Sequence, residues 1–325
     1  MKSFHHPMTF FLVLVTCSFF CLGKAIDCGG KDISNTITVN PNGKKAFTTI
    51  QDAINSVKSN NDKWVKIYIK AGLYKERPQI PIEKPCIILQ GEGSQNTIVS
   101  FSAHNGTSDS ATFTSSPPNV IVTGITFKNL YTDSPALAAR IYGDKSFIYN
   151  CSFMGYQDTL FDASGRHYIK NCYIEGEIDF IFGNAQSYYE NCEIKAIGRN
   201  PNLPGFVTAQ GRSSPDQPGG FVFEGGSIKG NGKVNLGRAW RPYARVIFHK
   251  TYFDSVVTPQ GWVAWTASGN ENRVTYAEVD CEGPGADSSK RVSWIKKLSS
   301  SDLEKLSFPV FINNDGWFDS LPTIS

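Results

Sequence analysis

Two aspartates, Asp158 and Asp179, follow similar phrases in neighbouring repeats of the sequence. Aligning these repeats places Asp158 on Asp179 and Phe161 on Phe182, which sets the two carboxyl groups side by side. Like charges directly opposite one another repel, so we expect one carboxyl to keep its proton while the other ionises. Such a pair supplies a general acid together with a nucleophile or base. The alternative is that both aspartates cap turns or accept backbone hydrogen bonds.

Two residues near position 240 suit the same site. Arg238 offers a planar guanidinium that can hold an ionised aspartate through two parallel hydrogen bonds. Trp240 lies two residues further on, so in a strand it would point the same way and offer a flat face to a sugar ring. A surface ion pair for the arginine and a packed aromatic for the tryptophan are the alternatives.

Other hydrolytic and cofactor chemistries have little support. Only three histidines, His104, His167 and His249, lie beyond the N-terminal apolar segment. The Gly-x-Ser-x-Gly elbow of serine esterases is missing, and so are Cys-x-x-Cys or His-x-x-x-His metal spacing and a Gly-rich phosphate loop. An esterase here would therefore work without a Ser-His-Asp triad.

An internal repeat indicates how these residues are positioned. Three similar phrases span residues 147–153, 168–174 and 188–194, with asparagines 21 and 20 residues apart at Asn150, Asn171 and Asn191. A period near 20 residues with short β-branched and aromatic runs is typical of a solenoid. The Leu-x-x-Leu-x-Leu skeleton of leucine-rich repeats is missing. We therefore predict one all-β domain, a right-handed parallel β-helix in which equivalent residues stack on neighbouring coils.

Two local features fit this architecture. The stacked asparagines are expected to have a structural role at turns between strands. One amphipathic helix is predicted at residues 49–57, where Ile50, Ala53 and Ile54 follow helical spacing and Thr49 begins a capping box. This helix would cover the open N-terminal end of the solenoid.

The first 25 residues resemble a secretory signal peptide, with a cationic start, a short apolar run and small residues near the end. We expect residues 26–325 to form the mature catalytic domain, secreted to the extracellular space or cell wall and free of the membrane. Removing Lys2 and Lys24 lowers the formal charge from +3 to +1. That balance provides no strong basic surface for nucleic acid, although it is compatible with an acidic polymer.

An oxidising compartment permits disulfides and glycans. Six cysteines remain after the signal, and their pairing stays open because Cys151, Cys172 and Cys192 can stack either as one bridged pair or as buried thiols. Of two Asn-x-Ser/Thr sequons, Asn105 lies in a polar loop and is the candidate for glycosylation. Asn150 lies inside an apolar repeat and is expected to be buried.

The chain resembles plant pectin methylesterases, the pectinesterases of carbohydrate esterase family 8, over nearly all of its mature length. It resembles the form without an N-terminal inhibitor-like region. The motifs in family order are Gly72-Leu-Tyr-Lys-Glu76, Gly155-Tyr-Gln-Asp-Thr-Leu160, Asp179-Phe-Ile-Phe-Gly183, Val207-Thr-Ala-Gln-Gly-Arg212 and Leu236-Gly-Arg-Ala-Trp240.

This resemblance implies a hydrolase acting on the methyl esters of pectin, and it implies neither a metal nor an organic cofactor. Asp179 would attack the ester carbonyl, Asp158 would act first as acid and then as base, and Gln157 would donate to the oxyanion. Arg238 would orient Asp179 and keep it ionised. The residues implied to line the substrate groove are Phe161, Phe182 and Trp240. The implied partners are methylated homogalacturonan and, as a candidate, a proteinaceous pectinesterase inhibitor, with the enzyme itself a monomer.

Two departures from the family pattern stand out. Pro135 occupies the position where the family usually carries a second oxyanion glutamine, and proline has no N–H to donate. Ala239 replaces a usual proline, which is a mild change. A weakened or inactive pectin-binding relative is therefore the main alternative function. A pectate lyase or polygalacturonase is a lesser alternative, because the sequence has no calcium-binding acidic cluster and no Gly-His-Gly.

Overall fold

The computed structural model describes residues 27–43, 46–104, 106–199 and 203–324. The predicted signal peptide at residues 1–25 and the candidate glycosylation site Asn105 lie outside these described residues. Nothing in the described part of the chain tests either prediction. Among the described residues, no helix is long and apolar enough to cross a bilayer.

Three parallel sheets run side by side along the molecule. After β1 and β2, which are neighbours in the same sheet, the chain visits the three sheets in strict rotation. The ten-stranded sheet contains β1 (Ile33–Val39), β2 (Trp64–Ile69), β5 (Ile87–Gly91), β8 (Val120–Thr123), β11 (Ser146–Tyr149), β14 (Arg166–Lys170), β17 (Gln186–Glu190), β20 (Gly220–Glu224), β23 (Arg245–His249) and β26 (Thr275–Val279). One eight-stranded sheet contains β3 (Gly72–Tyr74), β6 (Thr97–Phe101), β9 (Thr126–Asn129), β12 (Ser152–Met154), β15 (Tyr173–Gly176), β18 (Glu193–Ala196), β21 (Ser227–Gly230) and β24 (Tyr252–Phe253). The other contains β4 (Gln79–Ile80), β7 (Phe113–Ser115), β10 (Ala139–Ile141), β13 (Leu160–Asp162), β16 (Ile181–Gly183), β19 (Gly205–Gln210), β22 (Val234–Ala239) and β25 (Trp262–Val263).

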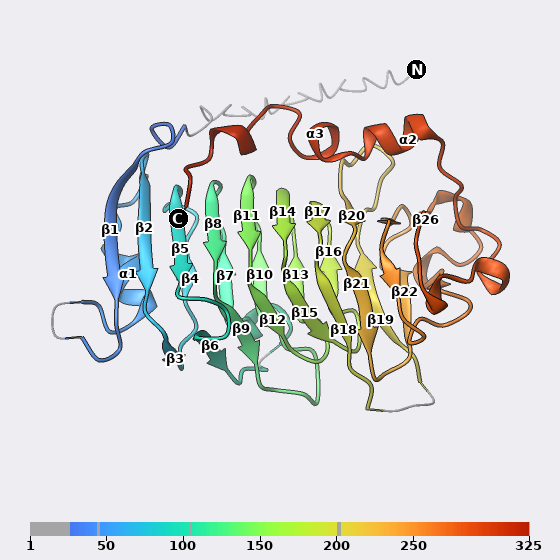
Figure 1. Ribbon diagram of the computed structural model, residues 1–325, viewed down its shortest axis with the longest axis horizontal. Coiled ribbons are helices and arrows are strands. Elements are labelled where there is room, and N and C mark those ends of the chain that lie inside the picture. The colour runs from blue at the N-terminus through green and yellow to red at the C-terminus, as the bar shows by residue number, and fades with distance from the viewer. Residues whose placement is uncertain (1–26, 44–45, 105, 200–202, 325) are drawn as a thin grey trace, which may run out of the picture.

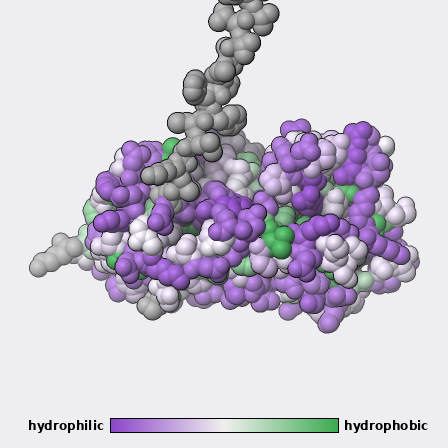
Figure 2. Space-filling model, turned by 90° about the horizontal axis from the view of Figure 1, so that it is seen from above, coloured by the Kyte–Doolittle hydropathy of each residue, from purple (hydrophilic) through white to green (hydrophobic). Residues whose placement is uncertain are grey.

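This arrangement is the right-handed parallel β-helix predicted from the repeat (Figure 1). Equivalent side chains stack along its interior, where the rings of Phe223 and Phe248 lie 4.5 Å apart and nearly parallel. Burial of such ladders on every coil supplies the main stabilising term of the fold. In the view from above, the outer surface is mainly hydrophilic, with hydrophobic residues in small separate patches (Figure 2).

The repeated asparagines occupy turns that require a left-handed backbone. Asn150, Asn171 and Asn191 each have a φ of 51°, a region that asparagine enters more readily than most residues. The backbone N–H of Asn171 donates to the Glu190 carbonyl of the next coil at 2.9 Å. The expectation that Asn150 is buried was wrong, because its turn projects from the coil and leaves the side chain exposed.

The N-terminal end of the solenoid is covered as predicted. Helix α1 (Ile50–Ser56) packs on β1, β2 and β4. The Thr49 hydroxyl accepts a hydrogen bond from the backbone of Asp52 at 3.1 Å. The carboxylate of Glu76 also accepts from the backbone N–H groups of Ile50 and Gln51, at 2.9 and 3.0 Å. An acidic group at this end of a helix satisfies its free donors and its dipole.

One of the open cysteine pairings is settled by the structure. Cys28 and Cys86 form a disulfide, whereas Cys151, Cys172 and Cys192 are stacked as buried free thiols. Near this disulfide lies the C-terminal segment, which runs back along the ten-stranded sheet from the far end of the solenoid (Figure 1). Its helices are α2 (Ser300–Lys305), α3 (Phe308–Phe311) and the 3₁₀ turn η6 (Phe318–Ser320). The other 3₁₀ turns are η1 (Ser108–Ser110), η2 (Trp265–Ala267), η3 (Glu271–Arg273), η4 (Pro284–Ala286) and η5 (Ser288–Lys290).

The turn asparagines provide a test of this backbone constraint. We expect Asn171→Ala to lower the free energy of unfolding by about 1 kcal/mol, because alanine resists a left-handed conformation. Asn171→Gly should lower it less, since glycine accepts positive φ without steric strain. Urea denaturation of both variants measures the difference. Equal destabilisation by alanine and glycine would mean that the amide side chain matters more than the backbone angle.

Candidate active site

The two aspartates lie at equivalent turns of adjacent coils. Asp158 lies between β12 and β13, and Asp179 lies between β15 and β16. Backbone pairing fixes the register on both sides, since Gln157 pairs with Ile178 and Phe161 with Phe182. This register is the one predicted from the repeat. The aspartate backbones are therefore about 4.8 Å apart, one strand spacing.

Both turns need a residue that tolerates a left-handed backbone. The φ angles of Asp158 and Asp179 are 61° and 49°, and aspartate and asparagine are the side-chain-bearing residues that enter this region most easily. The turns also need space, because a Cβ at Gly176 would lie 2.2 Å from the Cβ of Phe180. The aspartates therefore suit the geometry of these turns, and this structural role is compatible with a role in a reaction.

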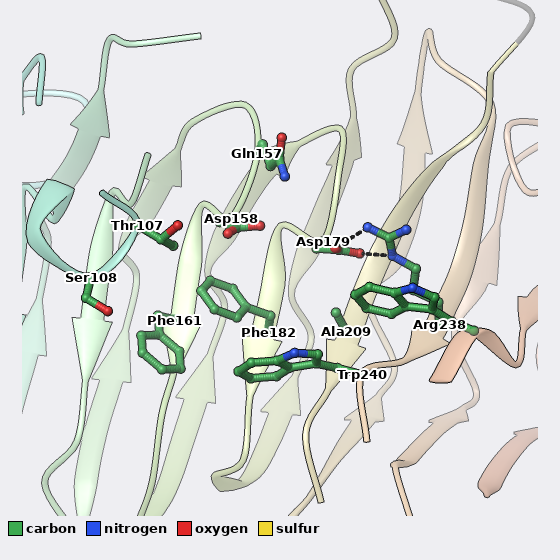
Figure 3. Close-up of a pocket in the computed structure, with 11 residues that line it drawn as sticks. Thr107, Ser108, Gln157, Asp158, Phe161, Asp179, Phe182, Ala209, Arg238 and Trp240 are labelled. Atoms are coloured by element: carbon green, nitrogen blue, oxygen red, sulfur yellow. Dashed lines mark hydrogen bonds and ion pairs between the residues drawn. The ribbon is translucent and has the colours of Figure 1, made fainter. Parts of the chain in front are cut away.

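Arg238 makes the environments of the two carboxyl groups different. Its Nε donates to Oδ1 of Asp179 at 2.8 Å, and its Nη2 donates to Oδ2 of the same carboxylate (Figure 3). The guanidinium is itself held between two aromatic rings, 4.3 Å from the Phe206 centroid and 4.0 Å from the Trp265 centroid. Such contacts on both faces favour a cation and fix its orientation. Among the described residues, no basic side chain forms an ion pair with Asp158 as Arg238 does with Asp179.

The electrostatics follow from this asymmetry. Burial raises the pKa of Asp158 to about 7, and the neighbouring charge of Asp179 adds to the rise. Burial also raises the pKa of Asp179, but its ion pair with Arg238 opposes that rise. The shared proton therefore resides on Asp158, and Asp179 stays ionised.

An aromatic wall continues from the two aspartates. Phe161 and Phe182 stack with centroids 4.5 Å apart and planes 4° from parallel. Trp240 meets Phe182 edge-on at 5.9 Å. The chain leaves room for this indole at Gly211, where a Cβ would lie 2.8 Å from the Trp240 ring. All three rings line the same cavity, and a wall of aromatic rings suits the apolar face of a sugar and a methyl group.

Every predicted catalytic and substrate-binding residue lines one cavity of about 410 Å³. Four residues that the sequence did not single out join them: Thr107 and Ser108 from the start of η1, Ala209 on β19 and Trp265 in η2. The complete lining is Thr107, Ser108, Gln157, Asp158, Phe161, Asp179, Phe182, Ala209, Arg238, Trp240 and Trp265 (Figure 3). Across the described residues, no cluster of three or more His, Cys, Asp or Glu side chains is placed to hold a metal ion.

Pro135 lies beside the turn that carries Gln157. The next residue, Ala136, donates its backbone N–H to the Gln157 carbonyl at 3.1 Å. The proline does not line the cavity, whereas the amide of Gln157 does. The hydroxyl-bearing residues Thr107 and Ser108 line the same cavity. The cavity therefore does not depend on position 135 for all of its hydrogen-bond donors.

Comparison with known proteins gives one consistent result. The sequence model described as pectinesterase matches residues 36–315. The chain is 47% identical over 306 residues to putative pectinesterase 10 of Arabidopsis thaliana, covering 91% of this chain and 90% of the relative. It is 43% identical to probable pectinesterase 29 of the same plant, covering 96% and 97%. The structure is similar to a pectin methylesterase from carrot (TM-score 0.84, 29% identity, 89% and 95% covered) and to one from Aspergillus niger (TM-score 0.77, 26% identity, 90% and 98% covered).

The raised pKa of Asp158 predicts a pH-dependent effect on stability. The folded protein holds this proton up to about pH 7, but the unfolded chain releases it near 3.8. The contribution of Asp158 to stability is therefore complete below the unfolded value and is lost as pH rises through the folded value. Asp158→Asn removes this loss and keeps a residue suited to positive φ. We expect its free energy of unfolding relative to wild type to rise by roughly 1–2 kcal/mol between pH 5 and pH 8.

Urea denaturation at the two pH values measures this difference. The matched control is Asp32→Asn, at an exposed position, which should show no comparable change between the two pH values. A difference that is the same at pH 5 and pH 8 for Asp158→Asn would contradict the proton assignment.

Proposed function

Because this chain belongs to the pectinesterase family and is a carboxylic ester hydrolase of that family, we propose that it hydrolyses galacturonate methyl esters of homogalacturonan with Asp179 as nucleophile and Asp158 as acid and base. The observation that carries this proposal is the unequal pair of aspartates. Arg238 binds only one of the two carboxyl groups, and the pKa of the other is raised to about 7.

The first half of the reaction uses both protonation states. A carboxylate oxygen of Asp179 attacks the ester carbonyl carbon, and the carbonyl becomes a tetrahedral oxyanion. As the oxyanion collapses, the bond to the methoxy oxygen breaks, and Asp158 gives its proton to that oxygen. Methanol leaves, and the galacturonyl group remains bound to Asp179 as an anhydride.

The second half regenerates the enzyme. Asp158, now ionised, takes a proton from a water molecule as that water attacks the anhydride carbonyl. The bond to Asp179 breaks, and the product leaves as galacturonic acid, which gives its remaining proton to the solvent and becomes a carboxylate. Both aspartates return to their starting states. The same residue acts as acid and then as base, which its pKa of about 7 favours near neutral pH.

The surrounding residues have supporting roles in this proposal. The amide of Gln157, which lines the cavity next to Asp158, donates to the oxyanion. Arg238 keeps Asp179 ionised and oriented. The rings of Phe161, Phe182 and Trp240 bind the sugar and the ester methyl group along the groove.

The setting of the enzyme is part of the proposal. A signal peptide at residues 1–25, glycan at Asn105 and action in the cell wall are compatible with one another and with the Cys28–Cys86 disulfide. The polymer itself is the proposed partner, and a proteinaceous inhibitor and a monomeric state remain sequence-based predictions.

A weakly active, pectin-binding relative is the second candidate function, and Pro135 is the observation that favours it. Losing one oxyanion donor can slow an enzyme by about 10²–10³-fold. Gln157 nevertheless lines the cavity, together with two hydroxyl-bearing residues, Thr107 and Ser108. We therefore favour an active esterase.

Replacing the aspartates tests the mechanism. Asp179→Asn should reduce methanol release from highly methylated pectin by at least about 10³-fold, because an amide is a poor nucleophile. Asp158→Asn should reduce it by about 10²–10⁴-fold through loss of the acid and base. Asparagine is preferred to alanine because both positions have positive φ. Thermal denaturation checks that each variant folds, and unchanged turnover by either variant would remove that aspartate from the mechanism.

Pro135 is tested by restoring the family residue. If a second oxyanion donor is absent, Pro135→Gln should leave kcat equal or raise it by up to about 10²-fold. Methanol release under saturating substrate measures the change. The Gln157→Ala variant provides the comparison, since it removes the donor that remains. A large fall in kcat for Pro135→Gln would show that the proline instead shapes the turn beside Gln157.

A further inference from the structure

One row of side chains links the active site to the coils before it. Backbone pairing aligns Arg140 on β10 with Phe161 on β13, Phe161 with Phe182 on β16, and Phe182 with Ala209 on β19. The residues on either side of Arg140, Ala139 and Ile141, are buried. Arg140 therefore points outward, on the same face as Phe161 and one coil before it.

The contacts of Arg140 place its guanidinium at the edge of the catalytic cavity. Its Nη1 donates to the backbone carbonyl of Ser108 at 2.7 Å, and Ser108 lines that cavity. The guanidinium carbon lies 5.4 Å from the centroid of the Tyr142 ring. Tyr142 in turn meets Phe161 at 6.0 Å, so the aromatic wall continues to the arginine.

The positive charge of Arg140 has no carboxylate partner among the described residues. Arg166, Arg238 and Arg291 each form an ion pair with an aspartate or glutamate. The acceptor that the structure provides for Arg140 is a neutral carbonyl, and its Nε is buried without an acceptor. The buried Nε is closed to an incoming ligand, so a substrate anion meets the Nη side of the guanidinium. A half-buried cation without a carboxylate partner gains free energy from such an anion.

We propose that Arg140 binds the carboxylate of a de-esterified galacturonate unit next to the unit whose ester is being hydrolysed. This inference rests on the proposed function, because the reaction itself produces such carboxylates along the polymer. Solenoid coils repeat every 4.8 Å or so, so a sugar chain lying along the row passes Arg140 as it leaves or approaches the aspartates. Arg140 is then a specificity-determining residue that favours action beside existing carboxylates.

The test compares two substrates. Methanol release is measured with fully methylated homogalacturonan and with a sample in which about half of the esters have been removed by alkali. For Arg140→Gln, we expect the ratio of kcat/KM, partly de-esterified over fully methylated, to fall about fivefold to tenfold. Arg140→Lys, which keeps the charge without the planar fork, should give an intermediate ratio.

Controls separate a binding site from a structural clamp. Arg77 also donates to the carbonyls of Asp109 and Ala111, so the loop that contains Ser108 is still held by these hydrogen bonds when Arg140 is replaced. If both substrates slow equally in Arg140→Gln, the residue only supports this loop and the proposal is overturned. Lys229→Gln removes one exposed charge from a different sheet. An equal fall in the ratio for that variant would show general attraction and would also overturn the proposal.

A binding measurement separates this inference from the esterase proposal. Calorimetry with fully de-esterified trigalacturonate requires no turnover. Weaker binding by Arg140→Gln than by wild type would support the carboxylate site even if no substrate released methanol. Equal affinities of wild type and Arg140→Gln for trigalacturonate would contradict the carboxylate site, even if the wild type is an active esterase.

Discussion

In-register pairing of parallel strands is the constraint on which the rest of this structure depends. Each strand pairs in register with the equivalent strand of the next coil, so equivalent residues of neighbouring coils lie side by side. The same pairing that stacks Phe223 on Phe248 inside the solenoid places Asp158 beside Asp179 outside it. Two carboxyl groups are thus held together by many backbone hydrogen bonds along the coils, and the proton kept on Asp158 removes the repulsion between them.

The electrostatic asymmetry arises from a residue two strands away. Arg238 on β22 reaches across β19 to the Asp179 turn, and its guanidinium is held by the rings of Phe206 and Trp265. Two turns at equivalent positions, both with positive φ at the aspartate, thereby acquire different proton affinities. The solenoid supplies two equivalent positions, and one long side chain from a later coil distinguishes them.

The repeat explains which features the sequence could predict. The coil period, the register of the aspartates and the outward row of Phe161 and Phe182 follow from residues that recur every 20 or 21 positions. Trp265 and Thr107 could not be predicted in the same way, because they enter the cavity from short 3₁₀ segments outside the repeat. The Cys28–Cys86 disulfide joins a turn before β1 to the bend before β5, and no sequence period relates these two positions. Asn150 was misjudged because an apolar phrase predicts buried strands but not the exposed turn between them.

The backbone also limits which acids can serve in this site. The turns at 158 and 179 have positive φ, which glycine, asparagine and aspartate accept more readily than glutamate does. Of these three residues, only aspartate carries a carboxyl group, so the turn and the chemistry favour the same residue. The conformational strain of the site is therefore small, and its main destabilising term is the burial of two acidic groups. The ion pair with Arg238 offsets part of the free-energy cost of burying Asp179. The cost of burying Asp158 is not offset in this way, and it raises the pKa of Asp158 into a range that suits a general acid.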